Sequence, residues 1–177
     1  MLTSDLPMVE ALRHANYRET SRRVLMHRGL AGFRAPVDVK LMQVRRKFQV
    51  SQAIEAQPDN WWQACVWSHA EWSRYHLTLK NGTEPIISAT FWEVLPLSRG
   101  WGVRTMGLVQ LDDTPEAREE GLSTFLLGEI LRQMQAGGIA QVEVQAAEND
   151  ATLIEIFSQL GFTKYDCGTL FCKAETC

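Results

Sequence analysis

The pattern of apolar and polar residues between positions 75 and 111 predicts three consecutive β-strands. Apolar and polar side chains alternate over residues 75–79, and the Asn81-Gly82 pair that follows is typical of a tight hairpin turn, because both residues accept positive φ angles. A return strand, a turn and a third strand are predicted next, over residues 86–95, 96–100 and 101–111. These three strands are expected to be antiparallel neighbours.

The spacing of apolar residues then changes to that of an amphipathic helix. Apolar side chains recur every three or four positions, at Leu122, Phe125, Leu126, Ile130 and Met134. Gly137-Gly138 follows and ends the helix, as glycine often does at a helix C-terminus. The helix is expected to cover one face of the sheet.

The remainder of the chain predicts a strand, a helix and two closing strands. Residues alternate over 141–147, and the next helix begins at an N-cap, Asn149 or Asp150, and ends at Gly161. The closing strands are expected on either side of Gly168, over residues 162–166 and 169–173.

This order of elements predicts an α/β (α+β) fold with a mixed, mostly antiparallel twisted sheet and helices on both faces. One strand–helix–strand crossover within it should be parallel and right-handed. The first 70 residues are less regular. A helix is predicted to start near Pro58 and to pack against the core, because the residues at helical spacing after it are Trp61, Trp62, Cys65, Val66, His69 and Trp72.

Length and composition favour a single soluble domain with a short additional element. The chain has 177 residues, of which 45% are hydrophobic and 22% are charged, which is average for globular domains. It has no apolar run of about 18 residues, and its first residues do not resemble a secretory signal. We therefore expect a cytoplasmic protein that does not partner with a membrane.

The charge balance argues against nucleic acid as the main partner. With 18 basic and 21 acidic residues the net charge is -3, although basic residues gather in the first third of the chain. That basic segment is interpreted as an ordinary solvated face. The four cysteines form no C-x-x-C pair, so a zinc ribbon is excluded and no metal is expected.

The most informative segment is residues 115–127, where a strand ends and a helix begins. Free backbone N–H groups of the first helical turn would converge there, and Gly121 and Ser123 would let a ligand approach the main chain. Arg118 could form charge-assisted hydrogen bonds to a phosphate. Glycine and serine are also common at ordinary strand-to-helix turns, so the loop alone leaves a purely structural interpretation open.

Two motifs resemble the GCN5-related N-acetyltransferase superfamily. Its acetyl-CoA loop has Arg or Gln, two residues, Gly, one residue, and Gly or Ala, and this chain has Arg118, Gly121 and Ser123 at that spacing. The strand VEVQAA followed by ENDATLIEIFSQLGF is similar to the strand, helix and terminal Gly-Phe of the same family. The resemblance covers about residues 75–173 and implies an acyl-CoA N-acyltransferase-like fold.

The resemblance also implies where the cofactor would bind. The pyrophosphate of acetyl-CoA would lie on the loop after Pro115, and the pantetheine would lie where two parallel strands diverge, as an added β-strand does. The implied cofactor-binding residues are Leu111, Asp113, Arg118, Glu119, Gly121, Leu122, Ser123, Thr124, Asn149 and Phe157.

Four positions depart from the family pattern. Ser123 replaces Gly or Ala and could add a hydroxyl donor for phosphate, while Glu119 and Glu120 place acidic groups beside the expected pyrophosphate and are expected to point to water. Phe157 stands where many members have a tyrosine that protonates the departing thiolate, and phenylalanine cannot donate a proton. Because a thiol has a pKa near 8.5, this loss need not abolish transfer.

The candidates for proton transfer are Glu93, Asp113 and Tyr165. Glu93 is near the end of a predicted central strand, Asp113 is at the mouth of the implied cleft, and Tyr165 could replace the missing acid. Further candidates for the base are His69, His76 and Asp112.

The N-terminus is predicted to be a remnant of a preceding acetyltransferase repeat. Residues 12–28 align without gaps on residues 157–173, with Asn16-Tyr17 on Gly161-Phe162, although chance similarity is an open alternative. The expected organisation is an N-terminal element over residues 1–50 and an acetyltransferase-like domain over residues 51–177. A homodimer is one open alternative for its assembly.

The expected function is acetyl-CoA-dependent transfer of an acetyl group to the amine of a small molecule or peptide. The amine would attack the thioester directly, without a metal. The alternatives are a catalytically weak or inactive module that binds CoA or a protein partner for regulation or assembly, and a protein associated with nucleic acid.

Overall fold

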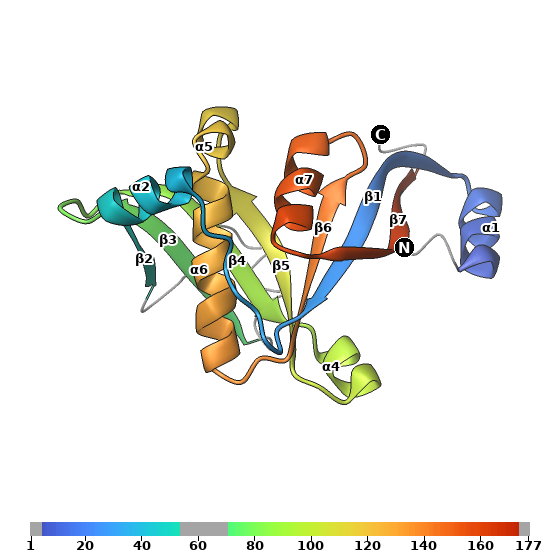
Figure 1. Cartoon of the computed structure of the whole chain (residues 1–177). Helices are drawn as coiled ribbons and strands as arrows, with labels where there is room; N and C mark the ends of the chain where they lie inside the picture. The colour runs from blue at the N-terminus through green and yellow to red at the C-terminus, as the bar shows by residue number, and fades with distance from the viewer. Residues whose placement is uncertain (1–4, 54–70, 174–177) are drawn as a thin grey trace. The chain divides into compact units, whose positions relative to one another are not determined.

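A computed structural model of the chain describes residues 5–53 and 71–173 (Figure 1). The chain divides into two compact units, which we call the central unit (residues 28–143) and the terminal unit (residues 1–27 and 144–177). The described residues form seven strands. Their hydrogen-bonded order is β2-β3-β4-β5-β6 in the central unit and β6-β1-β7 in the terminal unit, because β6 contributes residues to both.

The sheet of the central unit contains the predicted run of antiparallel strands. Strands β2 (Phe48–Gln52), β3 (Trp72–Leu79), β4 (Pro85–Glu93) and β5 (Thr105–Asp112) form three antiparallel pairs, β2–β3, β3–β4 and β4–β5. The tight turn predicted at Asn81-Gly82 is wrong, because residues 80–84 join β3 to β4 and neither of these two residues has a positive φ. Strand β6 (Gln141–Ala147) pairs with β5 in parallel. The predicted parallel crossover between these two strands is therefore confirmed.

Helices α2 (Val39–Lys47) and α6 (Leu122–Ala136) lie on one face of this sheet (Figure 1). Helix α6 packs on β2, β3 and β4, and α2 packs on α6. The side chains between them are fully buried, with 0% exposure for Leu77, Phe91, Leu126 and Ile130. The sequence prediction of α6 is confirmed, because its apolar stripe is the face that closes the core.

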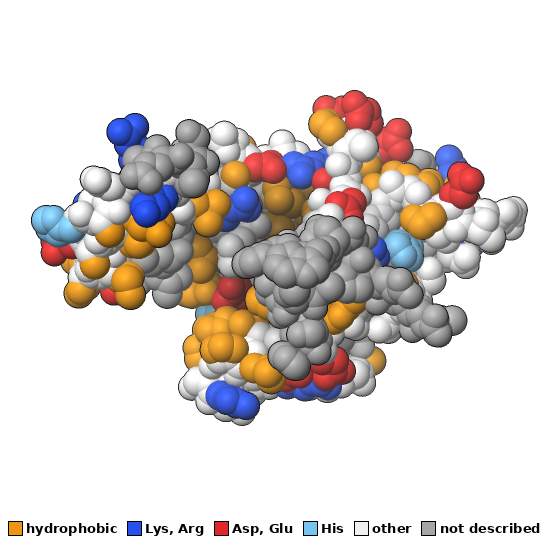
Figure 2. Space-filling view, turned by 180° about the vertical axis from the view of Figure 1, so that it is seen from behind, with side chains coloured by type: hydrophobic (Ala, Val, Ile, Leu, Met, Phe, Trp, Pro, Cys, Tyr) orange, Lys and Arg blue, Asp and Glu red, His pale blue; other side chains and the backbone are white. Residues whose placement is uncertain are grey.

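The segment between β4 and β5 corrects one prediction. Residues 96–100, expected as a turn, belong to helix α4 (Leu95–Trp101), and β5 begins at Thr105 instead of Trp101. Pro96 is at the start of the helix, where its fixed φ is tolerated, and Gly102 ends the helix with a φ of 67°. Figure 2 shows hydrophobic side chains gathered at the surface around α4, where Leu95 and Trp101 are exposed.

The terminal unit contains α1 (Leu6–His14), β1 (Tyr17–Gly29, which ends just beyond this unit), α7 (Ala151–Gln159) and β7 (Thr163–Lys173). The predicted α7 is confirmed, with Asp150 as its N-cap. The pair of closing strands is wrong, because β7 is one continuous strand. It pairs antiparallel with β1, and Gly168 lies opposite Arg23 instead of forming a turn.

The first and last helix–strand segments of the terminal unit have equivalent features 145 residues apart. Asp5 and Asp150 cap helices of nine residues each, and both carboxylates accept a hydrogen bond from the N–H three residues later. Asn16 and Gly161 follow these helices with φ angles of 61° and 79°. The pairing partners Arg23 and Gly168 have the same separation. Equivalent residues therefore meet at the centre of the β1–β7 ladder.

The helix predicted after Pro58 lies outside the described residues, apart from Trp72, which begins β3. Within residues 5–53 and 71–173, no helix is long and apolar enough to span a bilayer.

Candidate anion-binding site

The corner between β5 and α6 is formed by a short helix, α5 (Pro115–Glu119), and a glycine turn. The Thr114 hydroxyl caps α5 by accepting a hydrogen bond from the Ala117 N–H at 3.2 Å. Gly121 then adopts a φ of 78°, which is the left-handed region that favours glycine, and α6 begins at the next residue. The predicted loop therefore contains one turn of helix before the amphipathic helix begins.

The first turn of α6 presents its backbone donors without a side-chain cap. Hydrogen bonding within this helix begins with the Phe125 N–H, which donates to the Gly121 carbonyl at 3.0 Å. The N–H groups of Leu122, Ser123 and Thr124 precede this bond and have no intrahelical acceptor. Together with the partial positive charge of the helix terminus, they form a site suited to an anion.

Asp113 holds this corner together from inside. One of its carboxylate oxygens accepts hydrogen bonds from Arg118 Nε at 2.9 Å and from the Ser123 hydroxyl at 2.6 Å, and the other accepts from Arg118 Nη2 at 3.0 Å. Its side chain is only 1% exposed, and that of Arg118 is 20% exposed. Asp113, expected as a catalytic or cofactor-binding residue, thus connects the end of β5 to α5 and to α6.

This arrangement changes the roles expected for two other residues. The charge of Arg118 is offset by the Asp113 carboxylate, so Arg118 adds little net positive charge for a phosphate. The Ser123 hydroxyl donates its proton to Asp113, so it is not an additional donor toward the first turn of α6. The backbone N–H groups of the first turn of α6 are therefore the donors at this corner that neither residue blocks.

Lys40 of α2 contacts the same corner and was not identified from the sequence. Its ammonium donates a hydrogen bond to the Glu119 carbonyl. Its side-chain carbons lie beside Gly121, since a Cβ built on this glycine would be 3.6 Å from Cδ and Cε of Lys40. Glu119 and Glu120 are both exposed, as expected.

Beside this corner, β5 has the features expected of an open strand edge. Its parallel pairing with β6 covers only Thr105–Gly107 and Gln141–Glu143. A register shift against β4 inserts Val109 as an extra residue, so β5 has a β-bulge there. Leu111, expected to contact the cofactor, lies beyond the bulge and is partly exposed.

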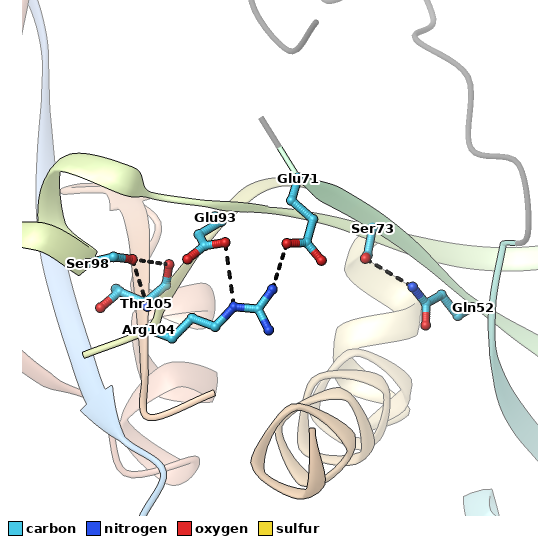
Figure 3. A network of polar contacts seen from close by, with 7 residues as sticks. All are labelled: Gln52, Glu71, Ser73, Glu93, Ser98, Arg104 and Thr105. Carbon is cyan, nitrogen blue, oxygen red and sulfur yellow. Dashed lines mark hydrogen bonds and ion pairs between the residues drawn. The ribbon is translucent and has the colours of Figure 1, made fainter. Parts of the chain in front are cut away.

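Glu93 lies at the opposite end of β5 from the α5–α6 corner. It pairs with Met106, six residues before Asp112, which corresponds to about 20 Å along the strand. Its carboxylate is 3.5 Å from Arg104 Nε, and Glu71 accepts a hydrogen bond from the same guanidinium at 2.6 Å (Figure 3). The two carboxylates, Glu71 more than Glu93, raise the pKa of Arg104.

The structure brings two of the shortlisted bases onto one face of the central sheet. His76 lies opposite Ser88, and Ser88 lies opposite Asp112. The Asp112 carboxylate accepts hydrogen bonds from the Ser88 hydroxyl at 2.8 Å and from Gln110 at 2.6 Å. Burial, and secondarily the charge of Arg74, lower the pKa of His76. His69 lies outside the described residues.

The other expected site residues belong to the terminal unit. Phe157 is completely buried and packs against Phe162, with ring centroids 5.6 Å apart. The rings of Tyr165 and His27 contact each other, with their centroids 5.0 Å apart, and Tyr165 is 38% exposed. Asn149 is exposed and immediately precedes the N-cap Asp150. In the described part of the chain, no group of three or more metal-ligating side chains comes together.

Comparison with solved structures identifies the fold. A tandem GNAT protein from the clavulanic acid biosynthesis pathway matches 94% of this chain with a TM-score of 0.64 and 11% identity. A GCN5-related N-acetyltransferase from Sphaerobacter thermophilus matches 97% with a TM-score of 0.63 and 12% identity, and one from Kribbella flavida matches 94% with a TM-score of 0.58 and 12% identity.

The chain spans less than two thirds of the length of these proteins, with coverage of 58%, 57% and 63% of their chains. No protein-family model matches the sequence. No curated protein matches it either.

Proposed function

From the fold of GCN5-related N-acetyltransferases, which this chain shares, we propose that the protein transfers an acetyl group from acetyl-CoA to an amine of a small molecule or peptide. The observation that carries this proposal is the uncapped first turn of α6, held behind Gly121 by the buried Asp113 carboxylate. Backbone donors at a helix N-terminus match the diphosphate of this coenzyme.

Asp113 supports diphosphate binding by fixing the donors before the ligand arrives. Its bonds to Arg118 and Ser123 hold the short helix and the start of α6 in one arrangement. Since these groups need not reorganise on binding, less free energy is lost when the diphosphate is captured.

The pantetheine arm would extend along β5, next to the residues that follow Gly107. Parallel pairing with β6 ends at that glycine, so the main chain of β5 can accept an added strand there. The bulge at Val109 disrupts the regular ladder and is suited to turning a backbone N–H toward the thioester carbonyl.

In the reaction, the amine nitrogen attacks the thioester carbonyl carbon, the carbon–sulfur bond breaks, and the thiolate leaves. The amine must lose one proton, and the thiolate takes up one at neutral pH. Phe157 cannot supply that proton, and Tyr165 is the proposed replacement. Glu93 is the proposed base among the residues named from the sequence, while Asp113 acts on the corner and not on the amine.

A second candidate function is a module that binds CoA without fast turnover. The replacement of the usual tyrosine by the buried Phe157 favours this alternative. Release of free thiol from acetyl-CoA, measured with a thiol-reactive dye and a panel of amines, separates the two functions. Sustained release of thiol with at least one amine supports the enzyme. If the protein binds CoA but no amine in the panel causes thiol release, the module is supported.

Coenzyme binding itself is tested by calorimetry with CoA on the wild type and on Gly121→Ala. A side chain at a φ of 78° is strained and should tilt the first turn of α6, so we expect CoA affinity to fall at least tenfold. Gly32→Ala is the matched control, because Gly32 has a φ of 68° and an added Cβ would contact nothing within 4 Å. If the wild type binds no CoA at millimolar concentration, or if both variants bind CoA like the wild type, the proposed diphosphate site is wrong.

A further inference from the structure

A cavity of about 270 Å³ lies between α2 and the start of α6, within the central unit. Its walls come from α2, from the first residue of β2, and from the α5–α6 corner. The lining residues are Lys40, Gln43, Val44, Lys47, Phe48, Glu120 and Leu122.

The polar part of this lining has a regular origin in α2. Lys40, Gln43 and Lys47 are three and four residues apart in sequence, so they share one side of the helix. Leu41 and Val44 are the buried residues of α2. The helix therefore anchors itself through apolar residues, while two lysines and a glutamine line the cavity.

The charges around the α5–α6 corner make these lysines significant. Arg118 is offset by Asp113, and Glu119 and Glu120 are acidic. Within the described ranges, no carboxylate oxygen lies within 4 Å of the Lys40 or Lys47 ammonium. Lys40 uses one donor on the Glu119 carbonyl, which leaves two, and Lys47 has three. The available cationic charge at this corner thus comes from α2.

We propose that this cavity binds the phosphate ester on the ribose of the coenzyme, with Lys47 and Lys40 as its cationic contacts and Gln43 as a neutral donor. The proposal rests on the proposed function. Leu122 lines the cavity and also begins the helical turn assigned to the diphosphate, so a second phosphate of the same molecule would be near. Lysine binds phosphate well as a compact point charge. Glu120 also lines the cavity, and its negative charge repels an anion. Only an anion that contacts both lysines would overcome this repulsion.

The experiment compares CoA with dephospho-CoA, which lacks only this phosphate, by calorimetry at 50 mM salt. For the wild type we expect CoA to bind about tenfold more tightly, and for Lys47→Gln we expect the difference to fall below threefold. Lys47→Arg should restore most of the difference, because it keeps the charge. Lys80→Gln, which removes an exposed lysine from the β3–β4 turn, is the control and should behave as the wild type. Lys40→Gln is the second variant and should also narrow the difference.

Other outcomes overturn the proposal and separate it from the proposed function. Equal affinities of the wild type for the two ligands would show that the ribose phosphate is not recognised, while CoA binding itself would stand. A Lys47→Gln variant that weakens both ligands equally would place the lysine on the diphosphate. If neither ligand binds the wild type at millimolar concentration, both the cavity assignment and the proposed function fail.

Discussion

Replacing Asp113 by asparagine should destabilise the protein by about 2–3 kcal/mol. Breaking a buried ion pair by changing one partner costs about 3–5 kcal/mol, and asparagine retains one oxygen that can still accept a hydrogen bond. Arg118 is 20% exposed and can recover some hydration, which lowers the cost further. For a chain of this length, the change corresponds to a decrease in Tm of roughly 5–10 °C.

The measurement is urea unfolding of Asp113→Asn beside Asp112→Asn as the matched control. Asp112 is the adjacent residue and is exposed, and its partners Ser88 and Gln110 are neutral, so its substitution should cost less than about 1 kcal/mol. CoA affinity should also fall for Asp113→Asn, because α5 and the first turn of α6 lose the contacts that hold them in one arrangement. If the two variants have the same unfolding midpoint, Asp113 does not organise the corner and the reasoning is refuted.

Two further predictions concern the central sheet. A Cβ added at Gly107 would lie 2.7 Å from a side-chain carbon of Val94. Gly107→Ala should therefore lower the free energy of unfolding, measured in urea, by about 1–3 kcal/mol. Gly100→Ala is the control and should not destabilise the fold, because its added Cβ would meet nothing within 4 Å. Burial, and then the charge of Arg74, lower the pKa of His76 in the folded protein. Because the imidazole binds a proton more readily in the unfolded chain, the stability of the fold should decrease as the pH falls below about 6.5. His76→Gln should reduce this slope between pH 7.5 and 5.5, and an unchanged slope would contradict the assignment.

The elements that could be predicted from the sequence are those whose contacts are local in sequence. The β3–β4 hairpin has alternating apolar and polar residues before Asn81-Gly82, although this pair does not form the tight turn that it predicts. Helices α6 and α7 each have one apolar stripe and a capping residue next to it. Strand β1 could not be predicted, because its first half is polar and exposed and its partners come from the other end of the chain. The same missing partner explains the error at Gly168, which resembles a turn residue until β1 lies beside it.

The candidate site divides in the same way. Gly121 and the start of α6 follow from sequence spacing, because a helix start has a local signature. The role of Asp113 depends on where Arg118 and Ser123 point, and Lys40 reaches the corner through the packing of α2 on α6. Neither contact has a sequence signal, since each depends on how the elements pack.

The proposal that the N-terminal element is a remnant of a preceding repeat gains support from backbone features and not from sequence identity. Caps and left-handed residues constrain only a few side chains, so Asp5 and Asn16 can match Asp150 and Gly161 while the residues between them diverge. Arg23 pairs with Gly168, and these two residues are also 145 positions apart. A chance similarity of two helices would not require this pairing. A duplicated segment that meets its own copy across an antiparallel ladder explains both observations, because antiparallel pairing of equivalent strands is centred on equivalent residues.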